Sequence, residues 1–271
     1  MEIIIFYFLI FCMGTVFGSF FTLAVYRIPL HKDITHERSF CPNCNHKLSF
    51  WDMIPILSYI FLKGKCRYCG QKIRIRYLLL EVCSGLVFLL FAVSLNLQLS
   101  HIDKWFYLVF GLLYIAGLFI IAGIDKEKHM VSKPVVLYEI IIVSVHMLYL
   151  CIFEQINIYR YVIYLAFIVL WNILEIFYYK RYLKSNYVLE NLSLLFIMAI
   201  FTYEIGIILT IILTLLAIAF TILLEKLKQS MIKYKKENKN ILQNFPIAFY
   251  LCVGNILVMI MMNFCTCGWY Q

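Results

Sequence analysis

Residues 105–124 read WFYLVFGLLYIAGLFIIAGI and are followed at once by the polar run DKEKH. The apolar run contains no charged side chain, and a helix needs about 20 mostly apolar residues to cross the hydrocarbon core of a bilayer. A strand of a membrane barrel would need only about 10 residues of alternating polarity. The stretch therefore predicts a membrane-spanning helix that ends at Asp125, and Asp125 is either a simple stop at the interface or part of a site.

The rest of the chain has the same character. Its 271 residues are 63% hydrophobic and 14% charged, which is more apolar surface than a water-soluble domain of this size can bury. Counting the apolar runs gives eight expected spans, at residues 3–26, 78–97, 105–124, 135–153, 158–178, 191–204, 206–224 and 245–264. The predicted fold class is an all-α polytopic membrane protein with about eight transmembrane helices.

The basic residues predict the orientation of these spans. Of the 24 Lys and Arg residues, 22 fall in the four segments 27–77, 125–134, 179–190 and 225–243. Because basic loops are retained in the cytoplasm, we expect these segments inside and both termini outside. The net charge of +9 then follows from topology, since a nucleic-acid-binding protein would gather its basic residues on one face. No nucleic-acid partner is expected.

The one large polar segment lies between the first two spans and contains two C-x-x-C pairs, Cys41 with Cys44 and Cys66 with Cys69. Two such pairs about 20 residues apart have the spacing of a four-cysteine structural zinc site. Cytoplasmic thiols are kept reduced, which disfavours disulfides; free or redox-active cysteines are the alternatives. Bound zinc would supply folding free energy that the loop lacks, and four protein ligands would leave no open position for catalysis.

Two acids are expected at the cytoplasmic ends of spans. Asp125 ends the third span, and Glu190 stands where a cytoplasmic segment enters the sixth. Two close carboxyl groups do not both ionise readily, so one can hold a proton while the other acts as a base toward water. Such a pair could hydrolyse a peptide bond without a metal or a covalent intermediate. A proton-coupled transporter is an alternative, because other titratable residues also lie in or near spans, namely Glu81, Glu139, Glu175, Glu204 and His146.

Together these motifs resemble one family, the prepilin peptidases, which are the leader peptidases and N-methyltransferases of type IV pilus and type II secretion systems. Residues 18–29, GSFFTLAVYRIP, are similar to the family's first helix and its exit, and Asp125 matches its first catalytic aspartate. FPIAFYL at residues 245–251 resembles its Pro-containing last helix. The cytoplasmic loop, residues 39–81, carries in the family's order both cysteine pairs, Ile54-Pro55, Ser58-Tyr59, Arg76-Tyr77 and Glu81.

The chain departs from the family's pattern at the second aspartate. The family has a G-x-G-D motif at the start of a helix, where this chain has Tyr187-Val188-Leu189-Glu190. Both glycines are absent, and the acid is one methylene longer. The family's Ile-Pro-Asp shortly after the first aspartate is replaced by Val131-Ser132-Lys133. Glutamate can supply the same carboxyl chemistry, although its reach changes the geometry of the pair.

The resemblance implies a membrane aspartic endopeptidase of the bacterial plasma (inner) membrane, with Asp125 and Glu190 as its catalytic residues. Its substrate would be a prepilin or pseudopilin in the same lipid bilayer, cut on the cytoplasmic side to release the basic leader. The resemblance further implies N-methylation of the new N-terminus with S-adenosylmethionine as methyl donor. No Rossmann-type glycine-rich turn is found, so the sequence does not locate the methyl-donor site.

The expected domains are a first transmembrane helix (residues 1–26), a cytoplasmic zinc-binding loop associated with methyl transfer (27–77) and a peptidase bundle (78–271). A catalytically degenerate relative that binds or assembles pilin machinery is the alternative reading, because both glycines of the motif are missing. The sequence leaves the oligomeric state open.

Overall fold

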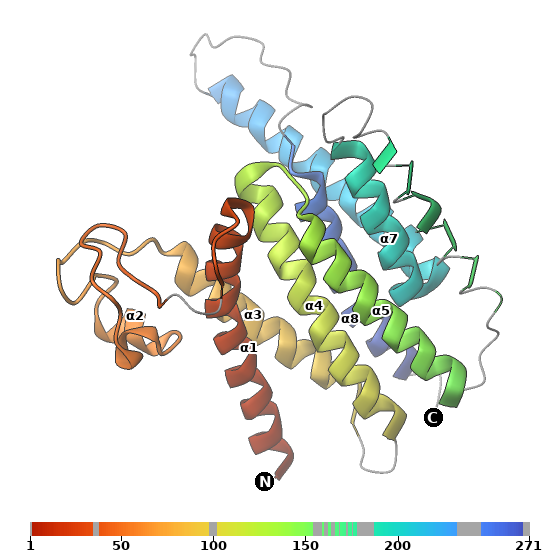
Figure 1. Cartoon of the computed structure of the whole chain (residues 1–271), viewed down its shortest axis with the longest axis horizontal. Coiled ribbons are helices and arrows are strands. Elements are labelled where there is room, and N and C mark those ends of the chain that lie inside the picture. The colour runs from red at the N-terminus through yellow and green to blue at the C-terminus, as the bar shows by residue number, and fades with distance from the viewer. Residues whose placement is uncertain are drawn as a thin grey trace. The chain divides into compact units, whose positions relative to one another are not determined.

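The fold is known from a computed structural model, which describes residues 2–34, 38–97, 102–153, 187–231 and 245–267, with single positions between 159 and 177. Its elements (Figure 1) are α1 (Glu2–Arg27), η1 (Ile28–Leu30), η2 (Phe50–Met53), α2 (Leu57–Phe61), α3 (Arg76–Ser94), α4 (Ile102–Lys128), α5 (Lys133–Phe153), α7 (Tyr187–Met231) and α8 (Ile247–Cys267). Across these ranges the sheet content is limited to two isolated bridges, Phe40 with Lys47 and Lys65 with Lys72. The predicted all-α fold class is confirmed.

Six helical segments of the described part are long and apolar enough to cross a membrane, and they correspond to six of the eight expected spans. They are Ile3–Leu30, Arg76–Ser94, Ile102–Lys128, Lys133–Phe153, Ile205–Leu224 and Ile247–Cys265. The short expected span at 191–204 corresponds to a shorter apolar segment, Glu190–Thr202. The expected span at 158–178 lies largely outside the described residues.

The boundary expected between the spans 191–204 and 206–224 is a bend inside one continuous helix. α7 has 45 residues, yet the amide of Asn255 in α8 donates to both Thr202 Oγ1 and Thr210 Oγ1, at 3.2 Å each. Eight residues of straight helix rise about 12 Å, which is farther than two such hydrogen bonds can reach. α7 therefore bends sharply between these threonines, and Figure 1 shows its second limb folding back.

The chain divides into two compact units, residues 1–123 with 263–271 and residues 124–262. In the first unit α1 and α3 pack closely through small residues. A Cβ atom on Gly14 would lie 2.8 Å from Gly85 Cα, and one on Gly18 would lie 2.8 Å from Glu81 Cα. The Ser84 hydroxyl donates to Gly14 O at 2.8 Å across the same contact. Small residues are what allow helix backbones to approach this closely within a membrane.

Candidate functional site

Asp125 lies in the last turn of α4, in the second unit, and is fully buried. α4 ends just after it because His129 adopts a left-handed φ of 51° and its N–H donates to Asp125 O at 2.8 Å, a common way to end a helix. The side chain accepts two hydrogen bonds, from the Tyr187 hydroxyl to Oδ1 at 2.7 Å and from the Phe249 N–H to Oδ2 at 2.8 Å. Both carboxyl oxygens are therefore oriented by groups from α7 and α8.

Tyr187, the first residue of α7, connects three helices through one oxygen atom. Its hydroxyl donates to Asp125 and accepts a hydrogen bond from the N–H of Ile247, the first residue of α8, at 2.7 Å. The first N–H groups of a helix have no partner within the helix, so the phenol oxygen also satisfies the start of α8. From the sequence, Tyr187 was expected only as a replacement for glycine, and its contact with Asp125 was not predicted. The sequence did contain a signal for a role of Tyr187 in the site, because its phenol stands one helical turn before Glu190.

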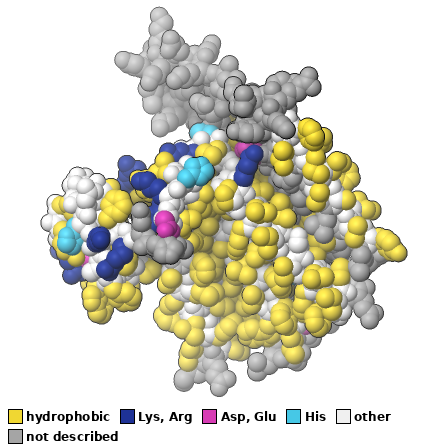
Figure 2. All heavy atoms as spheres, viewed as in Figure 1, with side chains coloured by type: hydrophobic (Ala, Val, Ile, Leu, Met, Phe, Trp, Pro, Cys, Tyr) yellow, Lys and Arg dark blue, Asp and Glu magenta, His cyan; other side chains and the backbone are white. Residues whose placement is uncertain are grey.

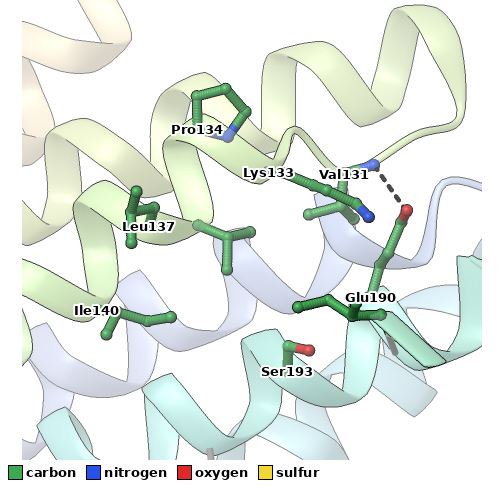
Figure 3. A pocket seen from close by; sticks show the side chains of 9 residues that line it. Val131, Lys133, Pro134, Leu137, Ile140, Glu190 and Ser193 are labelled. Carbon is green, nitrogen blue, oxygen red and sulfur yellow. Dashed lines mark hydrogen bonds between the residues drawn. The ribbon is translucent and has the colours of Figure 1, made fainter. Parts of the chain in front are cut away.

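Glu190 follows Tyr187 by one helical turn, so both side chains start from the same face of α7. Glu190 is 7% exposed, and its Oε2 accepts a long hydrogen bond of 3.4 Å from the Val131 N–H, in the turn between α4 and α5 (Figure 3). The structure thus brings Asp125 and Glu190 to the same end of the second unit, around that turn and the start of α7. Their catalytic roles remain a prediction.

A pocket of about 400 Å³ lies beside Glu190, between the first turns of α5 and α7 (Figure 3). Its polar lining comes from Lys133, Glu190 and Ser193, and the other lining residues are apolar: Val131, Pro134, Val136, Leu137, Ile140 and Ile176. An apolar pocket with a few polar groups at one end is typical of a ligand site. It is suited to an apolar segment that presents one polar bond to the carboxyl group.

The other titratable residues predicted to lie in or near spans have different surroundings. Glu139 is fully buried on α5, and neither of its carboxyl oxygens has a hydrogen-bond partner in the described part of the chain. It takes no part in the hydrogen bonds around Asp125 given above. His146, also on α5, is buried with its ring 5.0 Å from that of Phe201. Glu175 and the side chain of Glu204 lie outside the described residues.

The four cysteines of the loop lie together in the first unit. Their Sγ atoms are all within 4.8 Å of one another, and Cys41 Sγ is 3.9 Å from Cys69 Sγ. A tetrahedral zinc ion with Zn–S bonds of about 2.3 Å would hold its sulfur atoms about 3.8 Å apart. Cys41, Cys44, Cys66 and Cys69 therefore fit a structural metal site, as the spacing of the two pairs predicted.

Backbone N–H groups favour thiolate, the form that binds metal, at Cys41 and Cys69. At Cys44 the hydrogen bond from the His46 N–H is outweighed by burial and by the neighbouring sulfur atoms, which raise the pKa of Cys44 to about 11. The Gln71 N–H, followed by the Asn43 side-chain amide, lowers the pKa of Cys69 to about 6. A hydrogen bond from the Cys44 N–H lowers the pKa of Cys41. Thiolates at this spacing repel one another, and a bound divalent cation would remove that repulsion.

Two charged residues at the helix ends hold the loop in place. Arg27, at the end of α1, is 3% exposed and donates to Asp33 O at 2.8 Å and to Arg38 O at 3.4 Å. Glu81, in the second turn of α3, accepts a hydrogen bond from the Ile56 N–H at 2.8 Å. Glu81 thus supports the loop backbone, a role that needs no proton transfer.

Comparison with known proteins agrees with this arrangement. Residues 12–95 match the family described as Bacterial Peptidase A24 N-terminal domain. Proteins named "Prepilin leader peptidase/N-methyltransferase" from Myxococcus xanthus, Klebsiella pneumoniae and Bacillus subtilis are 42%, 33% and 32% identical to this chain over 79, 134 and 130 residues. The chain is related to the prepilin leader peptidases. The matched regions cover 29%, 47% and 48% of this chain, and no solved structure matches it.

The relationship to the prepilin peptidases confirms the resemblance noted in the sequence. This chain covers only 24%, 56% and 50% of the lengths of the three relatives. The family match at residues 12–95 includes α1 from Cys12 onward, the cysteine loop and α3, whereas Asp125 and Glu190 lie beyond it. Six apolar helical segments and this relationship identify a multi-pass inner-membrane protein; the orientation of its termini remains a prediction.

Proposed function

We propose that this chain is a membrane aspartic endopeptidase that removes the basic leader of a type IV prepilin or pseudopilin at the cytoplasmic membrane face. One observation carries the proposal: two buried acids, Asp125 from α4 and Glu190 from α7, converge on one end of the second unit. The names of the relatives supply the substrate class.

In the proposed reaction one carboxyl group is ionised and takes a proton from water as the water oxygen bonds to the peptide carbonyl carbon. The other carboxyl group, which is protonated, donates its proton to the carbonyl oxygen. When the C–N bond breaks, the proton taken from water passes to the leaving amine nitrogen. A hydroxyl proton of the tetrahedral intermediate returns to the other carboxyl group, so the acid pair regains its starting state. The hydrogen bonds from Tyr187 and Phe249 hold Asp125 in one orientation, which removes the cost of positioning it during the reaction.

The pocket beside Glu190 supports an apolar substrate segment next to the scissile bond. Its apolar walls come mainly from α5, and Lys133 and Ser193 are the polar groups near the acid. A prepilin leader is followed by a hydrophobic helix, so the residues after the cleavage point would be the ones to occupy these walls. Excluding bulk water from the two carboxyl groups would strengthen the electrostatic interactions between them.

We also infer the second activity that the relatives' names contain, transfer of a methyl group from S-adenosylmethionine to the new N-terminal amine. We assign no residues to this step. Cys41, Cys44, Cys66 and Cys69 would hold a zinc ion that stabilises the loop, because binding of a structural zinc ion contributes directly to folding.

A catalytically degenerate relative that binds pilins without cutting them is the second candidate, and Tyr187 favours it. The phenol oxygen lies 2.7 Å from Asp125 Oδ1, a position that the attacking water would otherwise be able to occupy. In the family's pattern a glycine, which has no side chain, stands at the position of Tyr187. The two candidates therefore differ in whether Tyr187 orients Asp125 or blocks it.

Cleavage of a model prepilin in membranes separates the candidates. For a peptidase, Asp125→Asn and Glu190→Gln abolish cleavage, while Glu190→Asp retains part of it because the carboxyl group is kept. Glu127→Gln is the matched control, since it removes the same charge from an exposed position in the last turn of α4 and leaves cleavage unchanged. A wild-type chain that cuts nothing, or a Glu190→Gln variant that cuts normally, would show that the proposed pair is wrong.

A further inference from the structure

The cysteine loop exposes large apolar side chains on two of its short helices. On η2 these are Phe50 and Trp51, which are 71% and 68% exposed; on α2 they are Leu57, Ile60 and Phe61, at 51%, 58% and 79%. None of them lies in a membrane-spanning segment. Contiguous exposed apolar side chains of this size usually mark a surface that contacts a partner or a membrane.

These five side chains, called here the η2–α2 surface, lie on two short helices that are neighbours in the fold. Leu57, Ile60 and Phe61 recur at the spacing that places residues on one face of a helix. Phe50 and Trp51 are in edge-to-face contact, with ring centroids 6.0 Å apart, and η2 packs against α2.

The surface belongs to a folded part of the loop. Asp52 in η2 accepts hydrogen bonds from Ser49 and pairs with Arg67 Nε at 2.7 Å, which ties η2 to the second cysteine pair. On α2 the Tyr59 hydroxyl donates to Ile73 O at 3.4 Å. The polar partners are thus used within the loop, and the apolar side chains are left facing outward.

The position of α2 along α3 sets the depth of this surface. Ile56 precedes α2 directly, and its N–H donates to Glu81 Oε2 at 2.8 Å. Glu81 lies five residues, or about 7.5 Å of helix, after the start of the membrane-spanning segment Arg76–Ser94. The start of α2 is therefore level with the first turns of α3, and Figure 1 shows the loop lying beside α1 and α3.

The charge of the loop also fits a lipid surface. Residues 38–76 contain eight Lys and Arg residues and one acid, Asp52, which is paired with Arg67. Seven of these basic residues are exposed, namely Arg38, Lys47, Lys63, Lys65, Arg67, Lys72 and Arg74. Figure 2 shows basic and hydrophobic side chains side by side on this lobe. Aromatic side chains at the headgroup level and basic side chains near anionic phosphates are the usual composition of a membrane-surface contact.

We propose that the η2–α2 surface docks the cysteine loop onto the anionic lipid surface of the bilayer that α1 and α3 cross. The phosphate headgroups contact the exposed Lys and Arg side chains, and the side chains of Phe50, Trp51 and Phe61 enter the interface below them. The proposal depends neither on peptidase activity nor on which membrane face carries the loop.

Tryptophan quenching in nanodiscs tests this docking with the full chain. Trp105→Phe, Trp171→Phe and Trp269→Phe leave Trp51 as the only tryptophan. In discs of brominated phosphatidylcholine with phosphatidylglycerol, we expect lipid bromine to quench Trp51 several-fold and aqueous acrylamide to reach it poorly. The quenching by bromine falls when phosphatidylglycerol is left out or when salt is raised, because salt screens the basic side chains.

Two variants of the single-tryptophan chain test the apolar and the basic contacts separately, and their zinc content shows that the loop is folded. Phe50→Ser with Phe61→Ser removes most of the bromine quenching and leaves the bound zinc unchanged. Lys63→Gln with Lys65→Gln and Lys72→Gln removes only the part of the bromine quenching that depends on phosphatidylglycerol. If the serine variant does not fold, comparing this lysine variant in discs with and without phosphatidylglycerol tests the docking. A zinc-loaded chain whose Trp51 is quenched by acrylamide and untouched by bromine overturns the proposal. Shielding from acrylamide without bromine quenching also overturns it, since a protein then covers the surface.

Discussion

The Tyr187 hydroxyl lies between Asp125 and the first N–H of α8, and it fills the place that a glycine has in the family's G-x-G-D pattern. Three residues later the acid is a glutamate, whose longer side chain reaches the Val131 N–H in the turn after α4. The two departures therefore act on the same corner of the molecule. The phenol of Tyr187 contacts Asp125. The additional methylene of Glu190 carries its carboxyl group toward the turn between α4 and α5.

We predict that Tyr187→Phe destabilises the protein and slows leader cleavage. The variant removes the donor to Asp125 and the acceptor for the Ile247 N–H, and a buried group left without its partner costs about 1–3 kcal/mol. Thermal unfolding in detergent measures the first effect. Tyr26→Phe, at a half-exposed tyrosine of α1, is the control and changes stability by less than about 0.5 kcal/mol.

The cleavage rate of the same variant distinguishes the two roles of Tyr187. If the hydroxyl orients Asp125, its loss lowers cleavage by about 10- to 100-fold, as expected when a catalytic group is no longer held in position. Faster cleavage by Tyr187→Phe would mean that the phenol blocks Asp125, and the reading as a degenerate relative would gain support.

Asp52 gives a prediction about pH. Burial alone would raise the pKa of Asp52, but hydrogen bonds from Ser49, together with Tyr68 and Arg67, lower this pKa below its ordinary value. A carboxyl group with a lower pKa in the folded state stabilises the fold above its unfolded-state pKa of about 3.9, and this contribution is lost as the pH falls through the folded-state pKa.

The expected result is a stability difference between wild type and Asp52→Asn that is full at pH 7 and narrows as the pH falls below about 4. Urea unfolding of the loop, followed by the fluorescence of Trp51 in the single-tryptophan chain, measures this difference at each pH. Loss of metal at low pH affects both proteins alike. A difference that stays constant down to pH 3 would contradict the stabilising role of the Asp52 carboxylate.

At the scale of elements, the sequence predicts a feature correctly where a local property, such as the length of an apolar run or the spacing of cysteines, determines it. Run length and hydropathy located six spanning segments, and cysteine spacing located the cluster of Cys41, Cys44, Cys66 and Cys69. Where α7 bends, the sequence predicted a break between two spans. The bend could not be read from local sequence, because the amide of Asn255 that bridges Thr202 and Thr210 comes from another helix. The contacts of Asp125 were missed for the same reason, since its partners are 62 and 124 residues away along the chain.

We predict that removing the metal unfolds the cysteine loop while the helices remain. Without a divalent cation the four thiolates lose their common partner, and a loop of this size has few buried apolar side chains to hold it together. Limited trypsin digestion with and without a chelator measures the change, through faster cleavage at the exposed residues Lys63 and Lys65.

The matched pair of variants is Cys44→Ser, which removes a ligand of the cluster, and Cys83→Ser, which replaces an exposed cysteine of α3 outside the cluster. Only the first lowers the zinc content and reproduces the effect of the chelator. A loop that resists trypsin in chelator would show that zinc is not what holds it.

At the scale of the whole molecule, the hydrogen bond between Tyr187 and Asp125 constrains the path of the chain. α5 starts at Lys133, close after Asp125, and its 21 residues rise about 31 Å, the thickness of a hydrocarbon core. α7 then begins at Tyr187, again beside Asp125. We therefore predict that the expected span at residues 158–178, most of which lies outside the described residues, returns the chain across the membrane.

Reporter fusions test this path together with the predicted orientation. Alkaline phosphatase is active only after export, and green fluorescent protein is fluorescent only in the cytoplasm, so the pair reports the side at each fusion point. We expect fusions after residues 130 and 184 to report the cytoplasm and a fusion after residue 155 to report the outside, as the basic residues at 179–190 require. If the fusions after 155 and 184 report the same side, the segment 158–178 does not cross. Tyr187 would then start α7 on the side opposite Asp125, and the pairing of Asp125 with Glu190 would be excluded together with the peptidase mechanism built on it.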